Sequence, residues 1–140
     1  MLRRWLRVGF YASCVAVGLV WFAAEHVFVD TREARIQVIM QSLEALETQV
    51  HSHPEDADAI RRLSRAYATW ILSEGTPIPG RIEAALADSS NPDLLAGTAQ
   101  ALQRQYDEAL QKGRPNLRLK KLSERYFERA KLINPKLDLE

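Results

Sequence analysis

The chain has 140 residues, of which 46% are hydrophobic and 26% are charged. This length leaves room for one domain with an anchor or tail, and the composition is typical of a folded chain. From Asp30 onward the chain carries 16 basic and 17 acidic side chains, a balance that argues against a nucleic-acid-binding surface. Cys14 is the single cysteine, which excludes an intramolecular disulfide, a cysteine-based zinc site and c-type haem attachment.

An uncharged segment lies near the N-terminus. Residues 8–24 form a run of 17 uncharged side chains, and three arginines precede it. A membrane-spanning helix needs about 20 mostly apolar residues, with about 17 as the lower limit. Because basic residues favour the cytoplasmic side, residues 1–29 are predicted to be a basic cytoplasmic stub and a single-pass transmembrane anchor. Residues 30–140 would then form an extracytoplasmic domain, which in a bacterium is a periplasmic domain attached to the inner membrane.

A cleaved signal peptide is the competing interpretation of this segment. Cleavage after Ala24 would place the bulky Phe22 at the −3 position, and cleavage after Ala23 would place Trp21 there. Signal peptidase sites carry small residues at this position, so the uncleaved anchor is favoured.

The rest of the chain is predicted to be all-α, because it has no period-2 alternation and no hairpin turn sequence. The first helix begins near Asp30 and ends before Pro54. Its predicted inner stripe is Ile36, Ile39, Met40, Leu43, Leu46 and Val50.

The second helix is predicted from about Pro54 to Glu74, with Pro54 in its first turn and Gly75 as its C-terminal cap. Its predicted inner face is Ile60, Leu63, Tyr67, Trp70 and Ile71. The segment 76–80 contains two prolines and a glycine and is predicted to be a loop. A short helix from Arg81 to Ala87 follows it.

Two longer helices complete the predicted domain. Asn91 and Pro92 provide a cap and a first-turn proline for the fourth helix, which Gly113 ends. The fifth helix follows the turn at 114–116 and runs to about Ile133. The predicted inner positions of both are Leu95, Ala99, Leu102, Tyr106, Ala109 or Leu110, Leu119, Leu122, Tyr126, Phe127, Ala130 and Ile133. These amphipathic helices can bury a modest shared core in a helical bundle.

Two stretches have the spacing of a known repeat. The first helix of a tetratricopeptide repeat carries large-x-x-Leu-small-x-x-Tyr, and its second helix carries a small residue, an aromatic, alanine and proline at set distances. The matching residues, taken as the repeat-signature core, are Ile60, Leu63, Ser64, Tyr67, Ser123, Phe127, Ala130 and Pro135. Because of these residues, the protein resembles a degenerate tetratricopeptide-repeat (TPR) protein. The resemblance extends over about 50 to 60 of the 140 residues. The loop at 75–80 interrupts the first match. The second match lacks a matching first helix, because Arg114 stands where that helix should carry an aromatic residue.

The anchor, together with the segment from Leu46 to Asp58 and the sequence Leu63-x-x-Ala66-Tyr67, is loosely similar to bacterial membrane-anchored assembly factors for c-type cytochromes. This similarity implies a docking platform for a client protein or for a client's terminal peptide.

A basic region covers residues 112–131, with eight basic and two acidic side chains. The candidate partner-binding residues in it are Arg114, Arg118, Lys121 and Arg125, which could meet an acidic partner or anionic lipid headgroups. The alternative is an ordinary solvated helix face with pairs at i, i+4.

No enzyme or cofactor is predicted. The chain has no serine-elbow motif, no phosphate-binding glycine loop and no cysteine nucleophile outside the uncharged segment. His51 and His53 lie two positions apart, so their imidazoles would point to different helix faces and do not predict a metal site.

Two functions remain. The first is a membrane-anchored protein–protein interaction module, a scaffold, adaptor or assembly factor acting outside the cytoplasm. The second is a small structural accessory subunit of a larger membrane complex, because the small residues Gly9, Ala12, Ser13, Ala16 and Gly18 would let the span pack closely on other spans.

Overall fold

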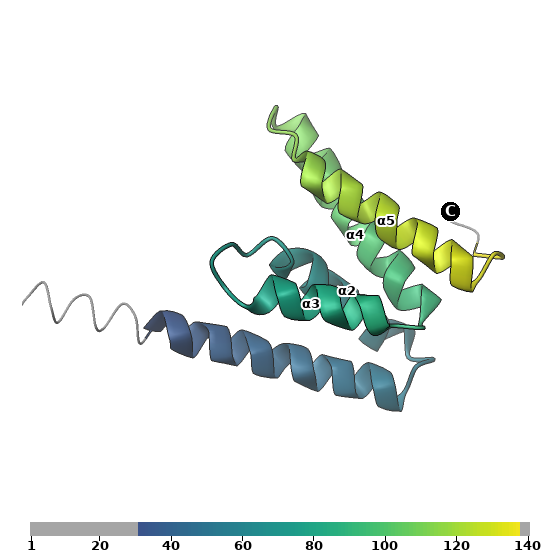
Figure 1. Cartoon of the computed structure of the whole chain (residues 1–140), viewed down its shortest axis with the longest axis horizontal. Coiled ribbons are helices and arrows are strands. Elements are labelled where there is room, and N and C mark those ends of the chain that lie inside the picture. Colours follow the sequence, from purple (N-terminus) through teal and green to yellow (C-terminus); the bar gives the residue numbers. More distant parts are fainter. Residues whose placement is uncertain (1–30, 138–140) are drawn as a thin grey trace, which may run out of the picture. The chain divides into compact units, whose positions relative to one another are not determined.

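The structure is a computed structural model that describes residues 31–137. All regular structure in this range is helical, which confirms the all-α class for these residues. The helices are one over residues 31–52, α2 (Ala57–Trp70), α3 (Ile78–Asp88), α4 (Pro92–Gln111) and α5 (Leu117–Ile133) (Figure 1). None of them is long and apolar enough to cross a bilayer. The predicted anchor over 1–29 and the predicted first-helix start at Asp30 lie outside the described residues.

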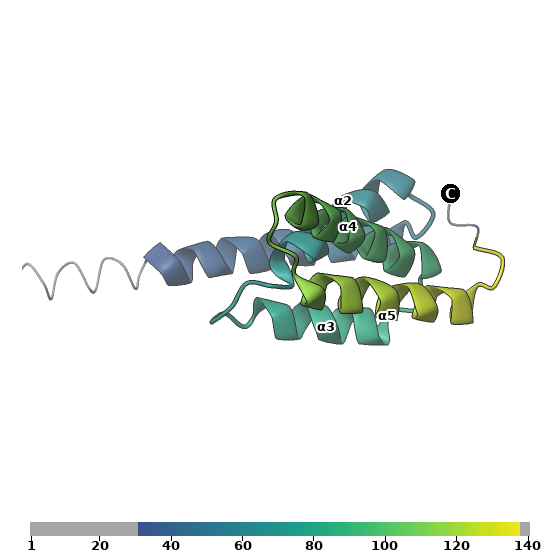
Figure 2. The same ribbon diagram turned by 90° about the horizontal axis from the view of Figure 1, so that it is seen from above.

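The chain divides after Ile39 into two compact units, and the packing described below lies within the second, from Met40 onward. Its central helix is α4, which runs antiparallel to α5 and also lies beside α2 (Figures 1 and 2). Leu95, Ala99 and Leu102 of α4 are fully buried in the core. Ser123 of α5 is buried against α4 and donates a hydrogen bond to the carbonyl oxygen of Ala99 at 2.9 Å.

The predicted second helix was too long at both ends. Pro54 lies in a turn before α2 rather than in its first turn, because Asp56 takes the capping position. The carboxylate of Asp56 accepts hydrogen bonds from the backbone N–H groups of Asp58 and Ala59, at 3.0 Å each. At the other end the hydroxyl of Ser73 donates to the carbonyl oxygen of Trp70, so the helix stops there. Gly75, at φ +70°, adopts a left-handed conformation in the loop after α2 and does not cap the helix, whose C-cap is Ile71.

The predicted third helix was too short, because α3 begins inside the segment expected to be a loop. Its first turn contains Pro79, and a proline there costs no hydrogen bond since the first N–H groups of a helix have no intrahelical partner. The side chains of Ile78, Ile82 and Leu86 are buried at four-residue spacing and hold the helix on the core.

The predicted boundaries of α4 and α5 are confirmed. Asn91 and Asn116 cap their N-termini with side-chain oxygens. At the end of α4 Gly113, at φ +69°, allows the N–H of Arg114 to reach the carbonyl oxygen of Ala109 at 2.9 Å. This is the Schellman arrangement, which requires a left-handed residue that glycine adopts without strain.

Most of the predicted inner positions are buried, and two are exposed. Leu110 is 51% exposed and Ile133 is 42% exposed, because both lie at the helix ends where no other described element covers them. A further eight are half-buried, which are Ile36, Ile39, Met40, Leu46, Trp70, Tyr106, Ala109 and Phe127. The stripe pattern therefore identifies the inner side of α2, α4 and α5, and its two exposed positions lie at helix ends.

The cap at Asp56 makes a pH-dependent contribution to stability. The hydrogen bond from the Ala59 N–H lowers the pKa of Asp56 below its ordinary 3.8. A lowered folded-state pKa stabilises the fold above the unfolded value, and this contribution is lost as the pH falls through the folded value. We expect Asp56→Asn, which keeps the cap without titrating, to lose less stability than the unsubstituted protein on acidification below about pH 4. Urea unfolding across this pH range measures the difference, and identical pH profiles would contradict it.

Arg129 connects α5 to the end of α3. Its guanidinium donates to the carbonyl oxygens of Leu86 at 2.8 Å, of Ala87 and of Ser89 at 3.3 Å. These oxygens belong to the last turn of α3 and its cap, where the helix dipole favours a cation.

Arg129→Ala is therefore expected to reduce the free energy of unfolding by about 1–2 kcal/mol, because it leaves three carbonyl groups without this donor. Arg125, one turn earlier in α5, is exposed and has no ion-pair partner among the described residues. Arg125→Ala should change stability by less than about 0.5 kcal/mol. Chemical denaturation compares the two variants, and an equal effect of both would refute the capping role.

Candidate functional site: a charged groove between two helices

Helices α2 and α4 approach each other closely at Ser64 and Gly97. The hydroxyl of Ser64 lies 3.4 Å from the carbonyl oxygen of Leu94, which also accepts from the hydroxyl of Thr98 at 2.8 Å. A Cβ atom added at Gly97 would lie 2.7 Å from the Ser64 Oγ and 3.3 Å from the Ser64 Cβ. The two backbones can be this close only because position 97 has no side chain.

Over this contact the two helices form a groove of about 720 Å³. From α2 and the residue before its cap, its lining comprises Glu55, Ala57, Ile60, Arg61, Ser64, Arg65 and Thr69. From α4, it comprises Asp93, Gly97, Gln100, Ala101, Arg104, Gln105 and Glu108. The groove thus has small residues at its floor and long polar side chains along both walls.

The charges in the groove are not paired with one another. Arg61 forms an exposed ion pair with Asp58, at 3.2 Å, on its own helix. Arg65 on α2 and Arg104 on α4 make no side-chain hydrogen bond or ion pair within residues 31–137. Glu55 and Asp93 lie at the N-terminal ends of the two helices. The groove therefore presents two guanidinium groups that have no side-chain partner among residues 31–137, the carboxylates of Glu55 and Asp93 at one end, and the carboxylate of Glu108 one turn after Arg104.

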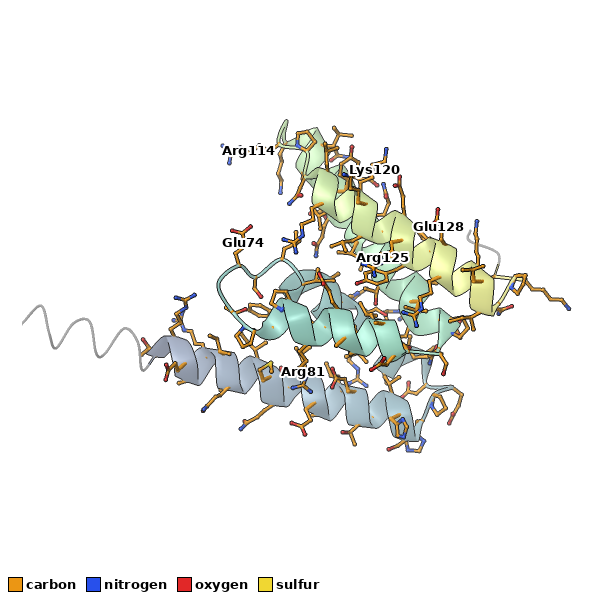
Figure 3. All side chains as sticks on the ribbon, in the orientation of Figure 1. Glu74, Arg81, Arg114, Lys120, Arg125 and Glu128 are labelled. Carbon is orange, nitrogen blue, oxygen red and sulfur yellow. The ribbon has the colours of Figure 1, made fainter. Side chains whose placement is uncertain are left out.

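A second hollow, of about 740 Å³, lies where residues 47–54 meet α2 and the end of α3. The carboxylate of Glu47, which lines this hollow, is already bonded to other side chains of the domain. One carboxylate oxygen of Glu47 accepts from the hydroxyl of Tyr67 at 2.8 Å, and the other accepts from Arg81 at 2.7 Å. Burial and the hydrogen bond to Glu47 raise the pKa of Tyr67. This cluster, in which Arg81 reaches from α3 (Figure 3), joins three helices and has a structural role.

The four residues proposed for partner binding from the sequence do not line the groove. Arg114 lies in the turn between α4 and α5, and Arg125 lies on α5 (Figure 3). Arg118 and Lys121 also lie on α5. All four are exposed. Arg118 forms an ion pair with Glu83 of α3 at 3.8 Å, so its charge already has a partner within the domain. The other three have no side-chain ion pair in the part of the chain that the structure describes.

Six of the eight repeat-signature residues are buried. Ile60, Leu63, Ser64 and Tyr67 pack on the inner side of α2, and Ser123 and Ala130 pack on α5. Phe127 is half-buried and Pro135 is exposed. The signature therefore marks packing positions, and two of its residues, Ile60 and Ser64, also line the groove.

The groove was missed at the sequence level. The available signal was the spacing of its two floor residues, since Ser64 and Gly97 are 33 positions apart. This is close to the repeat period of about 34 residues, at which equivalent helices of neighbouring repeats pack together. Arg65 and Arg104 could then have been assigned to one surface.

Together, the fold and the site define an all-α domain with a charged groove between two adjacent helices. No protein-family model matches the chain. Neither a curated protein nor a solved structure matches it. Among residues 31–137 no group of three or more histidine, cysteine or acidic side chains could hold a metal ion.

Proposed function

We propose that the protein is a membrane-anchored interaction module, an adaptor or assembly factor that holds a segment of a client protein outside the cytoplasm. The observation that carries this proposal is the α2–α4 groove with its unpaired Arg65 and Arg104. Because two guanidinium groups from facing helices share one groove, they favour a client segment with carboxylates.

The helix arrangement supports a TPR-like module. In a TPR array the first helices of successive repeats lie side by side, and each packs on its own second helix. Here α2 and α4 would be the first helices and α5 the second helix of the last repeat. The close contact at Ser64 and Gly97 and the buried hydrogen bond of Ser123 to α4 fit these roles. α3 would be a shortened second helix, separated from α2 by the loop at 71–77.

The anchoring half of the proposal rests on the 17 uncharged residues between the N-terminal arginines and the domain. Such an anchor would keep the groove at the membrane surface, which suits a protein that holds clients for assembly.

The groove predicts a specific loss of client binding. In the double variant Arg65→Glu/Arg104→Glu, repulsion would replace attraction at the centre of the groove, and client affinity should fall by about tenfold or more. Both the variant and the unsubstituted full-length protein are tagged at the C-terminus and purified in mild detergent. Mass spectrometry then compares the amounts of the proteins that co-purify with each.

The matched control is Arg62→Glu/Lys131→Glu, which makes the same change in net charge at exposed positions outside the groove. The control should retain the client. Equal loss in both variants would indicate a general charge effect and would contradict the groove assignment. A fixed set of membrane proteins retained by both variants would instead favour the accessory-subunit function.

A further inference from the structure

The turn between α4 and α5 is an exposed tip that the groove does not use. All residues from 110 to 118 are exposed, and they include two large apolar side chains. Leu110 is 51% exposed and Leu117 is 63% exposed. In Figure 1 this turn lies at the upper end of the α4–α5 pair, away from α3. These two leucines flank the turn, and each has more than half of its surface exposed.

The same tip is strongly basic. Residues 110–123 carry five cations, which are Lys112, Arg114, Arg118, Lys120 and Lys121, and no carboxylate. Arg118 and Lys120 have partners in Glu83 and Glu124, at 3.8 and 3.9 Å. The remaining three have no side-chain ion pair or hydrogen bond within residues 31–137. Asp107 and Glu108 lie about one turn back on α4, and Asp107 accepts a hydrogen bond from Gln103 at 2.9 Å.

The turn holds these groups in a fixed arrangement. Gly113 closes α4 with its left-handed conformation, and the side chain of Asn116 accepts from the N–H of Arg118 at the start of α5. A turn fixed at both ends keeps the leucines and cations on the surface instead of letting them fold back onto the domain.

We propose that the α4–α5 tip docks on an anionic phospholipid surface. Leu110 and Leu117 enter the interfacial layer, and Lys112, Arg114 and Lys121 contact lipid phosphates. Apolar side chains flanked by cations are the composition that binds this interface, since burial and charge attraction act together. Each cation near such a surface strengthens binding about fivefold. This contact goes beyond the proposed groove function and is independent of what the groove holds.

The test uses the full chain with Cys14→Ser and one nitroxide label at Leu117→Cys. The protein is reconstituted from detergent into vesicles of phosphatidylcholine alone or of phosphatidylcholine with phosphatidylglycerol. Electron paramagnetic resonance then measures collisions of the label with oxygen and with a water-soluble nickel chelate. The matched control label is Leu132→Cys, on the same helix, at a position 83% exposed and outside the tip.

The proposal predicts that phosphatidylglycerol raises the oxygen-to-chelate collision ratio severalfold at 117 and leaves it unchanged at 132. Lys112→Glu/Arg114→Glu and added salt should both cancel the increase. Equal ratios in the two kinds of vesicle would overturn the proposal. So would a label at 117 that responds only to an added acidic protein. If circular dichroism shows that the charge-reversed variant has lost helix, the salt dependence of the unsubstituted chain decides the outcome.

Discussion

Gly97→Ala is expected to destabilise the protein by about 1–2 kcal/mol, although alanine favours a helix over glycine by about 1 kcal/mol. The new Cβ would lie 2.7 Å from the Ser64 hydroxyl and 3.3 Å from its Cβ, so the buried hydroxyl would have to leave the carbonyl oxygen of Leu94 and the two helices would have to shift slightly. Gly97→Leu should cost more, about 2–3 kcal/mol, and would also fill the floor of the groove. Chemical denaturation measures both changes.

Two controls test the prediction for Gly97, and in both of them a glycine-to-alanine substitution should stabilise the protein instead of destabilising it. In α3, a Cβ at Gly80 would have nothing within 4 Å, so Gly80→Ala should stabilise the protein by about 0.5–1 kcal/mol. In a Ser64→Gly background the clash is absent, and Gly97→Ala should then also be stabilising. If Gly97→Ala stabilises the unsubstituted protein as Gly80→Ala does, the two helices are not in close contact at this point.

Glu47→Ala is the second substitution with a large expected effect, about 2–4 kcal/mol. Glu47 holds both the Tyr67 hydroxyl and the Arg81 guanidinium, and the side chains of Glu47 and Arg81 are only 25% and 28% exposed. Its removal leaves a half-buried cation and a buried hydroxyl without their acceptor. Thermal and urea unfolding of the variant measure the loss.

Glu44→Ala is the matched control, since Glu44 lies one turn earlier on the same helix and is exposed. Its effect should stay within about 0.5 kcal/mol. Replacing both members of the ion pair, as in Glu47→Leu/Arg81→Met, should cost less than Glu47→Ala, because no charge is left unpaired. A double variant less stable than Glu47→Ala would contradict the structural role of this cluster.

The sequence predicts a helix boundary well where one local signal dominates. Asn91, Gly113 and Asn116 each have one strong conformational role, and the ends of α4 and α5 are where these residues indicate. The ends of α2 were missed because two side chains other than Pro54 and Gly75 bond its terminal backbone groups: Asp56 accepts from the N–H of Ala59, and Ser73 donates to the carbonyl oxygen of Trp70. The start of α3 was missed because a proline is a helix breaker inside a helix and a good residue in its first turn.

The candidate site was less accessible from the sequence than the fold. Arg65 and Arg104 are 39 positions apart, and only the packing of α2 on α4 brings them into one groove. Arg129 belonged to the basic run on α5, but its contacts are with the carbonyl oxygens at the end of α3. Arg118 likewise pairs with Glu83. Charge runs along a chain predict an exposed face, while the pairing of each charge depends on tertiary contacts.

The central claim, that the α2–α4 groove holds a client protein, is tested most directly by site-specific photocrosslinking in cells. A photoreactive amino acid replaces Gln100 in the groove, and in the control it replaces Lys131 on the exposed side of α5. The account predicts one defined client crosslinked from position 100, absent at 131 and lost with Arg65→Glu/Arg104→Glu. The same products from both positions, or a crosslink at 100 that survives the charge reversal, would contradict it.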